Sequence, residues 1–166
     1  MSVPPQETEW PPEVERVARV LREARVESRV EQLDEGTGTA EAAAAAVGCG
    51  LAQIVKSLLF SCEDRWALAM IPGDRRADRA KVAKEAGAER ASTAGPGDVA
   101  RITGFPAGGV APFPLPGVHT IVFEQTMLGH DVVWIGAGSP LHVAAIAPAD
   151  LIRLSRARVV DLVSEN

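Results

Sequence analysis

One lysine in this sequence stands among residues that favour burial. Lys56 lies in the run QIVKSLLF (53–60), whose apolar content predicts a β-strand. Because side chains alternate along a strand, Lys56 shares a face with Ile54 and Leu58 and has no polar side to occupy. An anionic ligand such as a phosphate or a carboxylate would explain an ammonium group in this place. The alternative is a side chain that reaches solvent or protects a sheet edge.

A glycine-rich loop is the second place where chemistry is indicated. In GGVAP (108–112), Gly108 and Gly109 let the backbone adopt positive φ or approach a ligand closely. Successive N–H groups in such a loop can point at an anion or at the oxyanion of an acyl-transfer reaction. The alternative is an ordinary surface connection, so the loop indicates a ligand site only in combination with Lys56. The surrounding segment, 105–117, holds four prolines and three glycines and predicts a long irregular loop.

Other kinds of chemistry are not indicated by the sequence. GxSxG, HExxH and paired CxxC patterns are absent, so we predict neither a serine nucleophile nor a metal site, and no cofactor. Cys49 and Cys62 flank the predicted strand and are expected to be free thiols. His142 follows a predicted hairpin turn; a structural histidine is expected there, with a substrate contact as the alternative. An enzyme with these residues would depend on positioning and electrostatics.

Length and composition describe one ordinary domain. The chain has 166 residues, of which 46% are hydrophobic and 23% charged, and it shows no repeat and no second compositional region. No signal segment and no apolar run of about 18 residues is visible, so we expect a cytoplasmic protein without a membrane partner. The formal charge of −5 argues against broad coating of nucleic acid but leaves room for a small basic patch that holds one strand end.

The predicted elements alternate between helices and strands. Four prolines among residues 1–12 predict an irregular arm, which leaves 13–166 as the folded domain. Periodicity and capping residues predict helices at 13–25, 39–48, 74–87, 97–104 and 148–157. Apolar and alternating runs predict strands at 28–34, 51–62, 66–73, 119–124, 131–138, 141–146 and 158–163. Short connections between neighbouring strands favour an α/β fold, a single domain with a mixed, largely antiparallel central sheet flanked by helices.

Four segments together resemble the YbaK/prolyl-tRNA synthetase-associated domain family of aminoacyl-tRNA deacylases. They are QIVKSLLF, WALAMIPGDRRAD, ITGFPAGGVAPF and DVVWIGAGSPLHVAAIAPADLIRLSRARVVDLV, and the resemblance covers roughly Val26 to Val163. Its most specific elements are Lys56 and the GxxxP loop, Gly108 to Pro112. The resemblance implies a YbaK-like editing domain that hydrolyses the ester between a wrongly attached small amino acid and the terminal adenosine of a tRNA.

The resemblance also implies roles for individual residues. Lys56 is expected to contact the nucleotide end, and Gly108 to position the aminoacyl carbonyl across a cleft from it, so that a water attacks without a protein nucleophile. Residues expected to contact the substrate are Phe105, Gly109, Val110, Ala111, Pro112 and His142. Glu124 stands where family members often carry an aspartate, and Ala111 where a serine is frequent; we assign Glu124 no catalytic role.

The function that the resemblance implies is a free-standing trans-editing deacylase, with tRNA for proline as the expected tRNA. Its partners would be the 3′ end of an aminoacyl-tRNA and, as a further candidate, an aminoacyl-tRNA synthetase. A non-catalytic ligand- or protein-binding module on the same fold is the alternative from another class. A hydrolase of some other small acyl ester is a third hypothesis.

Overall fold

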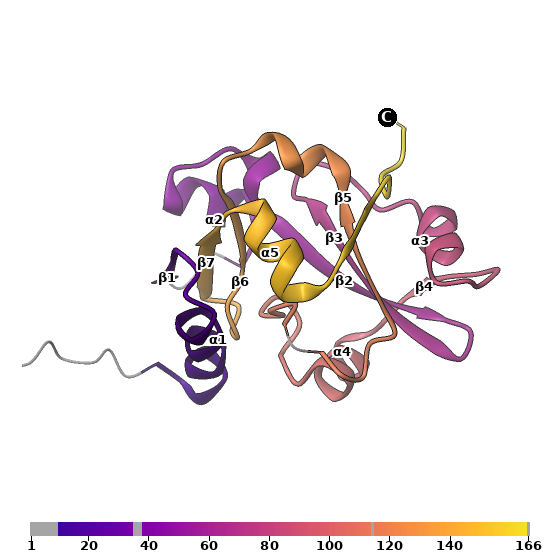
Figure 1. Ribbon diagram of the computed structural model, residues 1–166, viewed down its shortest axis with the longest axis horizontal. Helices are drawn as coiled ribbons and strands as arrows, with labels where there is room; N and C mark the ends of the chain where they lie inside the picture. Colours follow the sequence, from indigo (N-terminus) through magenta and orange to yellow (C-terminus); the bar gives the residue numbers. More distant parts are fainter. Residues whose placement is uncertain (1–9, 35–37, 114, 166) are drawn as a thin grey trace, which may run out of the picture.

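Two β-sheets with helices packed around them make up the structure, a computed structural model that describes residues 10–34, 38–113 and 115–165 (Figure 1). The strands are β1 (Ser28–Gln32), β2 (Val55–Cys62), β3 (Arg65–Pro72), β4 (Ser92–Thr93), β5 (Thr120–Glu124), β6 (Val133–Gly136), β7 (His142–Ile146) and β8 (Arg158–Val160). The helices are α1 (Pro12–Glu23), α2 (Ala40–Val47), α3 (Arg79–Glu85), α4 (Pro96–Thr103) and α5 (Pro148–Ser155), with 3₁₀ turns η1 (Leu51–Gln53) and η2 (Gln125–Gly129). None of the described helices is long and apolar enough to cross a membrane.

The larger sheet has the strand order β4-β2-β3-β5-β8, and the smaller has the order β1-β7-β6. β2 pairs antiparallel with β3 and with β4, whereas β5 runs parallel to both β3 and β8. The smaller sheet is antiparallel throughout, and a single parallel bridge from Ile54 to Trp134 connects it to β2. The predicted single α/β domain with mixed, largely antiparallel pairing is therefore confirmed, with the strands divided between two sheets instead of one.

The larger sheet is buried on both faces. One face packs against α1, α4 and α5 through a cluster that includes Leu59, Leu68 and Phe123. The other face packs against α3 through a cluster that includes Phe60 and Ile71. Figure 1 shows α1 beside the smaller sheet and α3 at the opposite end of the molecule. Burial on both faces explains why β2 and β3 read as nearly continuous apolar runs.

The outer edge of β2 is open over part of its length. β4 pairs only with Phe60 and Ser61 of this strand, and the Leu59 carbonyl accepts a hydrogen bond from Ala94 N–H. The Ile54 carbonyl instead accepts from Gly73 N–H on the β3 side. Because backbone groups alternate in direction along a strand, the N–H and C=O of Ser57 face the outer edge, where no described strand pairs with them. This gap is where the candidate site lies.

Several predicted boundaries are confirmed by capping contacts. Thr39 Oγ1 accepts from Ala42 N–H at 3.1 Å at the start of α2, and Gly48 ends that helix with φ 76°. Glu63 turns the β2–β3 hairpin with φ 61°. Cys49 and Cys62 are free thiols, as predicted.

Other boundaries were wrong for local reasons. The strand predicted from residue 51 begins at Val55, because Leu51–Gln53 forms a 3₁₀ turn in which Ile54 N–H bonds to the Leu51 carbonyl. The helix predicted from residue 74 begins at Arg79, because Asp78 accepts from the N–H groups of the first turn. α1 begins at Pro12, within the predicted arm, and residues 1–9 of that arm lie outside the described residues.

Glu124 has a structural place at the end of β5. Its side chain is fully buried; Oε1 accepts from Leu162 N–H and Oε2 from Thr126 N–H, each at 2.8 Å. We predict that Glu124→Ala lowers the free energy of unfolding by about 3 kcal/mol, because two backbone donors lose their acceptor. Denaturant titration measures this loss, and Glu124→Gln, which keeps one acceptor oxygen, should lose less. Equal losses in the two variants would contradict the assignment.

Candidate functional site

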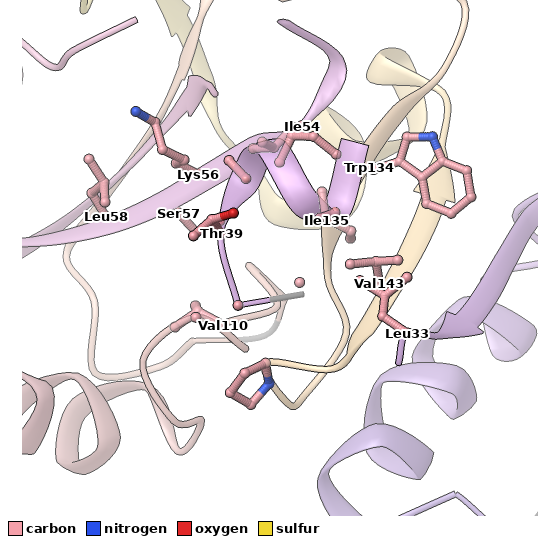
Figure 2. Close-up of a pocket in the computed structure, with 17 residues that line it drawn as sticks. Leu33, Thr39, Ile54, Lys56, Ser57, Leu58, Val110, Trp134, Ile135 and Val143 are labelled. Carbon is pink, nitrogen blue, oxygen red and sulfur yellow. The ribbon is translucent and has the colours of Figure 1, made fainter. Parts of the chain in front are cut away.

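A pocket of about 290 Å³ lies against the open edge of β2. Its walls come from β2, the start of α2, the β6–β7 hairpin and the loop 105–117 (Figure 2). Most of the lining is apolar, with Ile54, Val110 and Trp134 among the residues that form it. Polar groups come from Thr39, Lys56 and Ser57. A mainly apolar cavity with a few polar groups is the usual form of a small-ligand site.

Lys56 lies at one end of this pocket. Its Nζ donates a hydrogen bond to the Arg75 carbonyl at 2.7 Å, and Figure 2 shows the amine directed away from Val110. Burial lowers the pKa of Lys56; the carboxylates of Asp74 and Glu41 oppose this effect, and Arg76 adds to it. Lys56 and Gly108 therefore line one pocket, but the charge lies at the end away from the glycine loop.

Ser57 is the polar group that the sequence reasoning missed. Its side chain leaves β2 on the face opposite Lys56 and lines the pocket. Among the described residues, Ser57 Oγ is the one buried side-chain oxygen or nitrogen without a hydrogen-bond partner. A buried hydroxyl without a partner costs about 1–3 kcal/mol, which a bound ligand would recover. Because no base contacts it, Ser57 is not activated as a nucleophile.

The glycine loop forms the wall at the other end of the pocket. Gly108 has φ 84°, a conformation that other residues seldom adopt. Gly109 N–H donates to the Pro106 carbonyl and the Gly109 carbonyl accepts from Gly138 N–H, both at 2.9 Å. Gly109 N–H is thus occupied, whereas the N–H groups of Gly108 and Val110 form no hydrogen bond within the described part of the chain.

The loop and the β6–β7 hairpin approach each other more closely than side chains would allow. A Cβ atom added at Gly109 would lie 2.7 Å from three backbone atoms of Ser139. One added at Gly136 would lie 2.7 Å from the Val110 carbonyl oxygen. One added at Gly138 would lie 2.6 Å from the Glu13 carbonyl oxygen in α1. These glycines fix the pocket wall by direct backbone contact.

Of the residues predicted to touch the substrate, Val110 lines the pocket and the others lie elsewhere. Phe105 is buried beneath the Arg16 guanidinium, which is 4.6 Å from the ring centroid. Ala111 is fully buried in the core, and Pro112 lines a different hollow. Gly109 packs against the hairpin, as described above.

His142 lies on the face of β7 opposite Val143, the neighbour that lines the pocket. Its Nδ1 is 2.5 Å from Ser139 Oγ, and its ring meets the Trp10 ring edge-on at 5.4 Å. Burial lowers the pKa of His142. These contacts give His142 a structural position that holds the hairpin turn against the residues before α1.

The described part of the pocket lining holds no group of side chains suited to metal binding. No cluster of three histidine, cysteine, aspartate or glutamate side chains suited to a metal ion occurs in the described ranges 10–34, 38–113 and 115–165. The described lining also has no histidine and no carboxylate. Among the described residues, the polar groups that this pocket offers a ligand are Lys56, the hydroxyls of Thr39 and Ser57, and backbone N–H groups.

Comparison with known proteins places the chain in a family. The profile of the aminoacyl-tRNA editing domain matches residues 34–154, and the chain belongs to that family. A proline–tRNA ligase of Nitratidesulfovibrio vulgaris (strain DP4) is 35% identical over 100 residues, which is 60% of this chain but 17% of the ligase. The Bacillus subtilis protein YwhH, of uncharacterised function, is 29% identical over 134 residues, covering 80% of this chain and 85% of YwhH.

Solved structures share the fold over nearly the whole chain. A crystal structure described as a candidate trans-editing enzyme for prolyl tRNA synthetase has a TM-score of 0.86 and 33% identity, covering 95% of this chain and all of that one. The hypothetical protein APE2540 has a TM-score of 0.81 and 27% identity, covering 89% and 99% of the two chains. The predicted relationship to YbaK-type editing domains is confirmed.

Gly109 gives a test of the close contact in the pocket wall. We predict that Gly109→Ala lowers the free energy of unfolding by about 1–3 kcal/mol, because its methyl group would overlap the Ser139 backbone. Gly97→Ala is the matched control, since Gly97 lies in α4 with open space around it and alanine favours a helix. Urea denaturation of both variants checks the prediction, which fails if they are equally stable.

His142 predicts a pH dependence of stability. The pKa of His142 in the folded protein is below the ordinary value near 6.5. As the pH falls, His142 is therefore protonated in the unfolded chain at a higher pH than in the folded protein. Above about pH 6.5 His142 is neutral in both states and does not reduce the free energy of unfolding. Between about pH 6.5 and its lowered pKa, protonation of the unfolded chain reduces the free energy of unfolding. Thermal melts of His142→Gln between pH 8 and pH 5 should show a shallower decline than wild type. His130→Gln controls for the loss of a histidine, and identical pH profiles for His142→Gln and wild type would contradict the prediction.

Proposed function

We propose that this protein is a trans-editing deacylase, which hydrolyses the ester between a mischarged small amino acid and the 3′ end of a tRNA. The observation that carries the proposal is the single pocket that combines Lys56, Ser57 and the Gly108 loop in a chain of the aminoacyl-tRNA editing family. The relatives named for prolyl-tRNA synthesis support tRNA for proline as the substrate RNA. An aminoacyl-tRNA synthetase is the proposed protein partner for the same reason.

The two ends of the pocket suggest how the substrate lies. The Lys56 ammonium suits the terminal phosphate, which would replace the Arg75 carbonyl as its hydrogen-bond acceptor. The aminoacyl ester would then reach across the open edge of β2 toward the glycine loop. Ser57 Oγ and the outward-facing backbone of β2 lie between these ends and would hydrogen-bond the polar atoms of the bound ester.

The reaction follows from the groups that are present. A water oxygen attacks the ester carbonyl carbon, and the negative charge that develops on the carbonyl oxygen meets the unpartnered N–H groups of Gly108 and Val110. The bond to the ribose oxygen then breaks, giving a free amino acid and a ribose hydroxyl. Because the described lining offers no imidazole or carboxylate, the proton passes through water or the neighbouring ribose hydroxyl.

Pocket dimensions favour a small amino acid. A volume of about 290 Å³ is at the low end for ligand sites and would have to hold the nucleotide end as well as the amino acid, which leaves room only for a small side chain. Ile54, Val110 and Ile135 make the walls apolar, so a small aliphatic side chain is better suited than a charged one. Such walls reject an extra methylene by only about 1–3 kcal/mol, so the protein would accept a narrow group of small residues.

Hydrolysis of mischarged tRNA tests the proposal directly. Alanyl-tRNA for proline, incubated with purified protein, should lose its amino acid faster than in buffer. Lys56→Met should lower kcat/KM about 10- to 100-fold, because a hydrogen bond to a charged group contributes about 1.5–3 kcal/mol. Lys84→Met removes an exposed lysine of α3 and should leave the rate unchanged.

Ser57→Ala separates a ligand contact from a structural role. This variant should be as stable as wild type or more so, because it removes an unpartnered hydroxyl, yet it should deacylate more slowly.

Equal deacylation by wild type and Lys56→Met would exclude the proposed mechanism. Binding of the tRNA end without any hydrolysis would favour a non-catalytic binding module.

A further inference from the structure

A second hollow surface carries positive charge at the other end of the larger sheet. Two hollows of about 570 and 380 Å³ share His119, Ile121 and Arg156, so they form one continuous depression. It lies beside the amino ends of β3, β5 and β8, where Arg65 and Arg158 stand. We call it the basic groove, defined by Arg65, His119, Ile121, Arg156 and Arg158. No part of the proposed deacylation chemistry uses these residues.

The charge of this groove differs from that of the whole chain. The charged residues that line the 380 Å³ hollow are three arginines and one glutamate, Glu85. With His119 neutral, their formal charges add to +2. The complete chain carries −5. A positive region on a negative protein orients an anionic partner toward that region.

Two of the arginines are held by the end of α3. Arg158 donates to the Glu85 carbonyl at 2.7 Å and lies 3.2 Å from Glu85 Oε2. Arg65 donates to the Ala86 carbonyl at 3.4 Å and lies 4.0 Å from Asp64 Oδ1. Each guanidinium has five N–H donors, so these contacts fix the side chains and leave donors for a ligand.

Arg156 has an unusual backbone position. It ends α5 in the left-handed conformation, with φ 57° and ψ 33°. Gly48 and Gly104 occupy this position at the ends of α2 and α4, and glycine is the residue that adopts it without strain. The Arg156 guanidinium forms no hydrogen bond or ion pair in the described ranges. Because glycine would be less strained in this conformation, the presence of an arginine at position 156 points to a role for its side chain.

The groove and the pocket meet at the same loop. Val110 lines the pocket, and Pro112, two residues later, lines the hollow that continues into the basic groove. In the proposed orientation the RNA strand leaves the pocket at the Lys56 end, so the groove is available to parts of the RNA beyond its terminal nucleotide.

We propose that the basic groove binds the phosphate backbone of the RNA whose 3′ end occupies the pocket. The inference rests on the proposed function, because that function supplies an RNA at the pocket. Guanidinium groups match the geometry of phosphate oxygens, and arginines spaced along a groove fit an elongated anion with repeated charges. Arg156, at the junction of the two hollows, is the central contact.

Steady-state deacylation with two substrates tests this inference. Full-length aminoacyl-tRNA extends into the groove, whereas an aminoacyl-adenosine ester fills only the pocket. Arg156→Gln should raise KM for the tRNA about fivefold at 0.15 M salt, because one phosphate contact is lost, and leave hydrolysis of aminoacyl-adenosine unchanged. Arg153→Gln, on the same helix but outside the groove, should behave as wild type.

Arg156→Gly separates backbone from side-chain effects. Glycine suits the left-handed position, so this variant should melt about 2 °C higher than wild type and still show the fivefold increase in KM. Binding of uncharged tRNA, measured by fluorescence anisotropy against salt concentration, should show a log–log slope smaller by about 0.9 for both Arg156 variants.

The possible outcomes are distinct. If wild type deacylates and both Arg156 variants keep its KM and its salt slope, the groove does not bind RNA and the proposed function stands. If wild type hydrolyses neither substrate, the proposed function fails, and the anisotropy slopes still decide whether the groove binds RNA. If the variants lose binding to a synthetase and keep binding to tRNA, the groove is a protein interface and the inference is overturned.

Discussion

The functional half of this molecule depends on an interrupted hydrogen-bond ladder along β2. β2 pairs with β3 over its whole length, but on its other side the described residues make only the Ile54–Trp134 bridge and the short pairing with β4. The edge between these contacts needs partners, because an unpaired strand edge is otherwise exposed to solvent or to another chain. Side chains of α2, the β6–β7 hairpin and the glycine loop surround it without pairing, and the pocket is the space that they leave.

The rigidity of this space comes from backbone packing rather than from side chains. The glycine loop, the hairpin and the start of α1 touch through Gly109, Gly136 and Gly138, where even a methyl group would overlap a neighbouring backbone atom. A hydrogen bond between Gly138 N–H and the Gly109 carbonyl locks two of these segments together. A site held this firmly presents its N–H donors in a fixed arrangement, which is what stabilisation of a developing oxyanion requires.

Much of the fold could be predicted because its signals are local. Thr39 and Gly48 mark the ends of α2, and alternation assigned the faces of β2 correctly. The pocket was harder, because its far wall depends on a bridge between Ile54 and Trp134, eighty positions apart, for which no local pattern exists. Ser57 was missed for a related reason: its neighbours on that face are apolar, and only packing reveals a hydroxyl without a partner. Lys56 and Gly108 were singled out by local sequence, as a charge in an apolar run and as part of a glycine pair before a proline, and the family resemblance then supplied their expected roles.

Backbone carbonyls hold several cations of the candidate sites. Lys56 donates to a backbone carbonyl, whereas Arg65 and Arg158 each donate to a carbonyl and also lie near a carboxylate, that of Asp64 or Glu85. Elsewhere Lys81, Arg101 and Arg153 are paired directly with aspartates. A carbonyl fixes a cation in place without cancelling its charge, whereas a carboxylate neutralises it. Under the two proposals, a phosphate at Lys56 would displace a neutral acceptor, and one in the groove would meet Arg156, whose guanidinium has no ion pair among the described residues. Local positive charge of this kind is what would let a chain with a net charge of −5 bind a polyanion at the two proposed places.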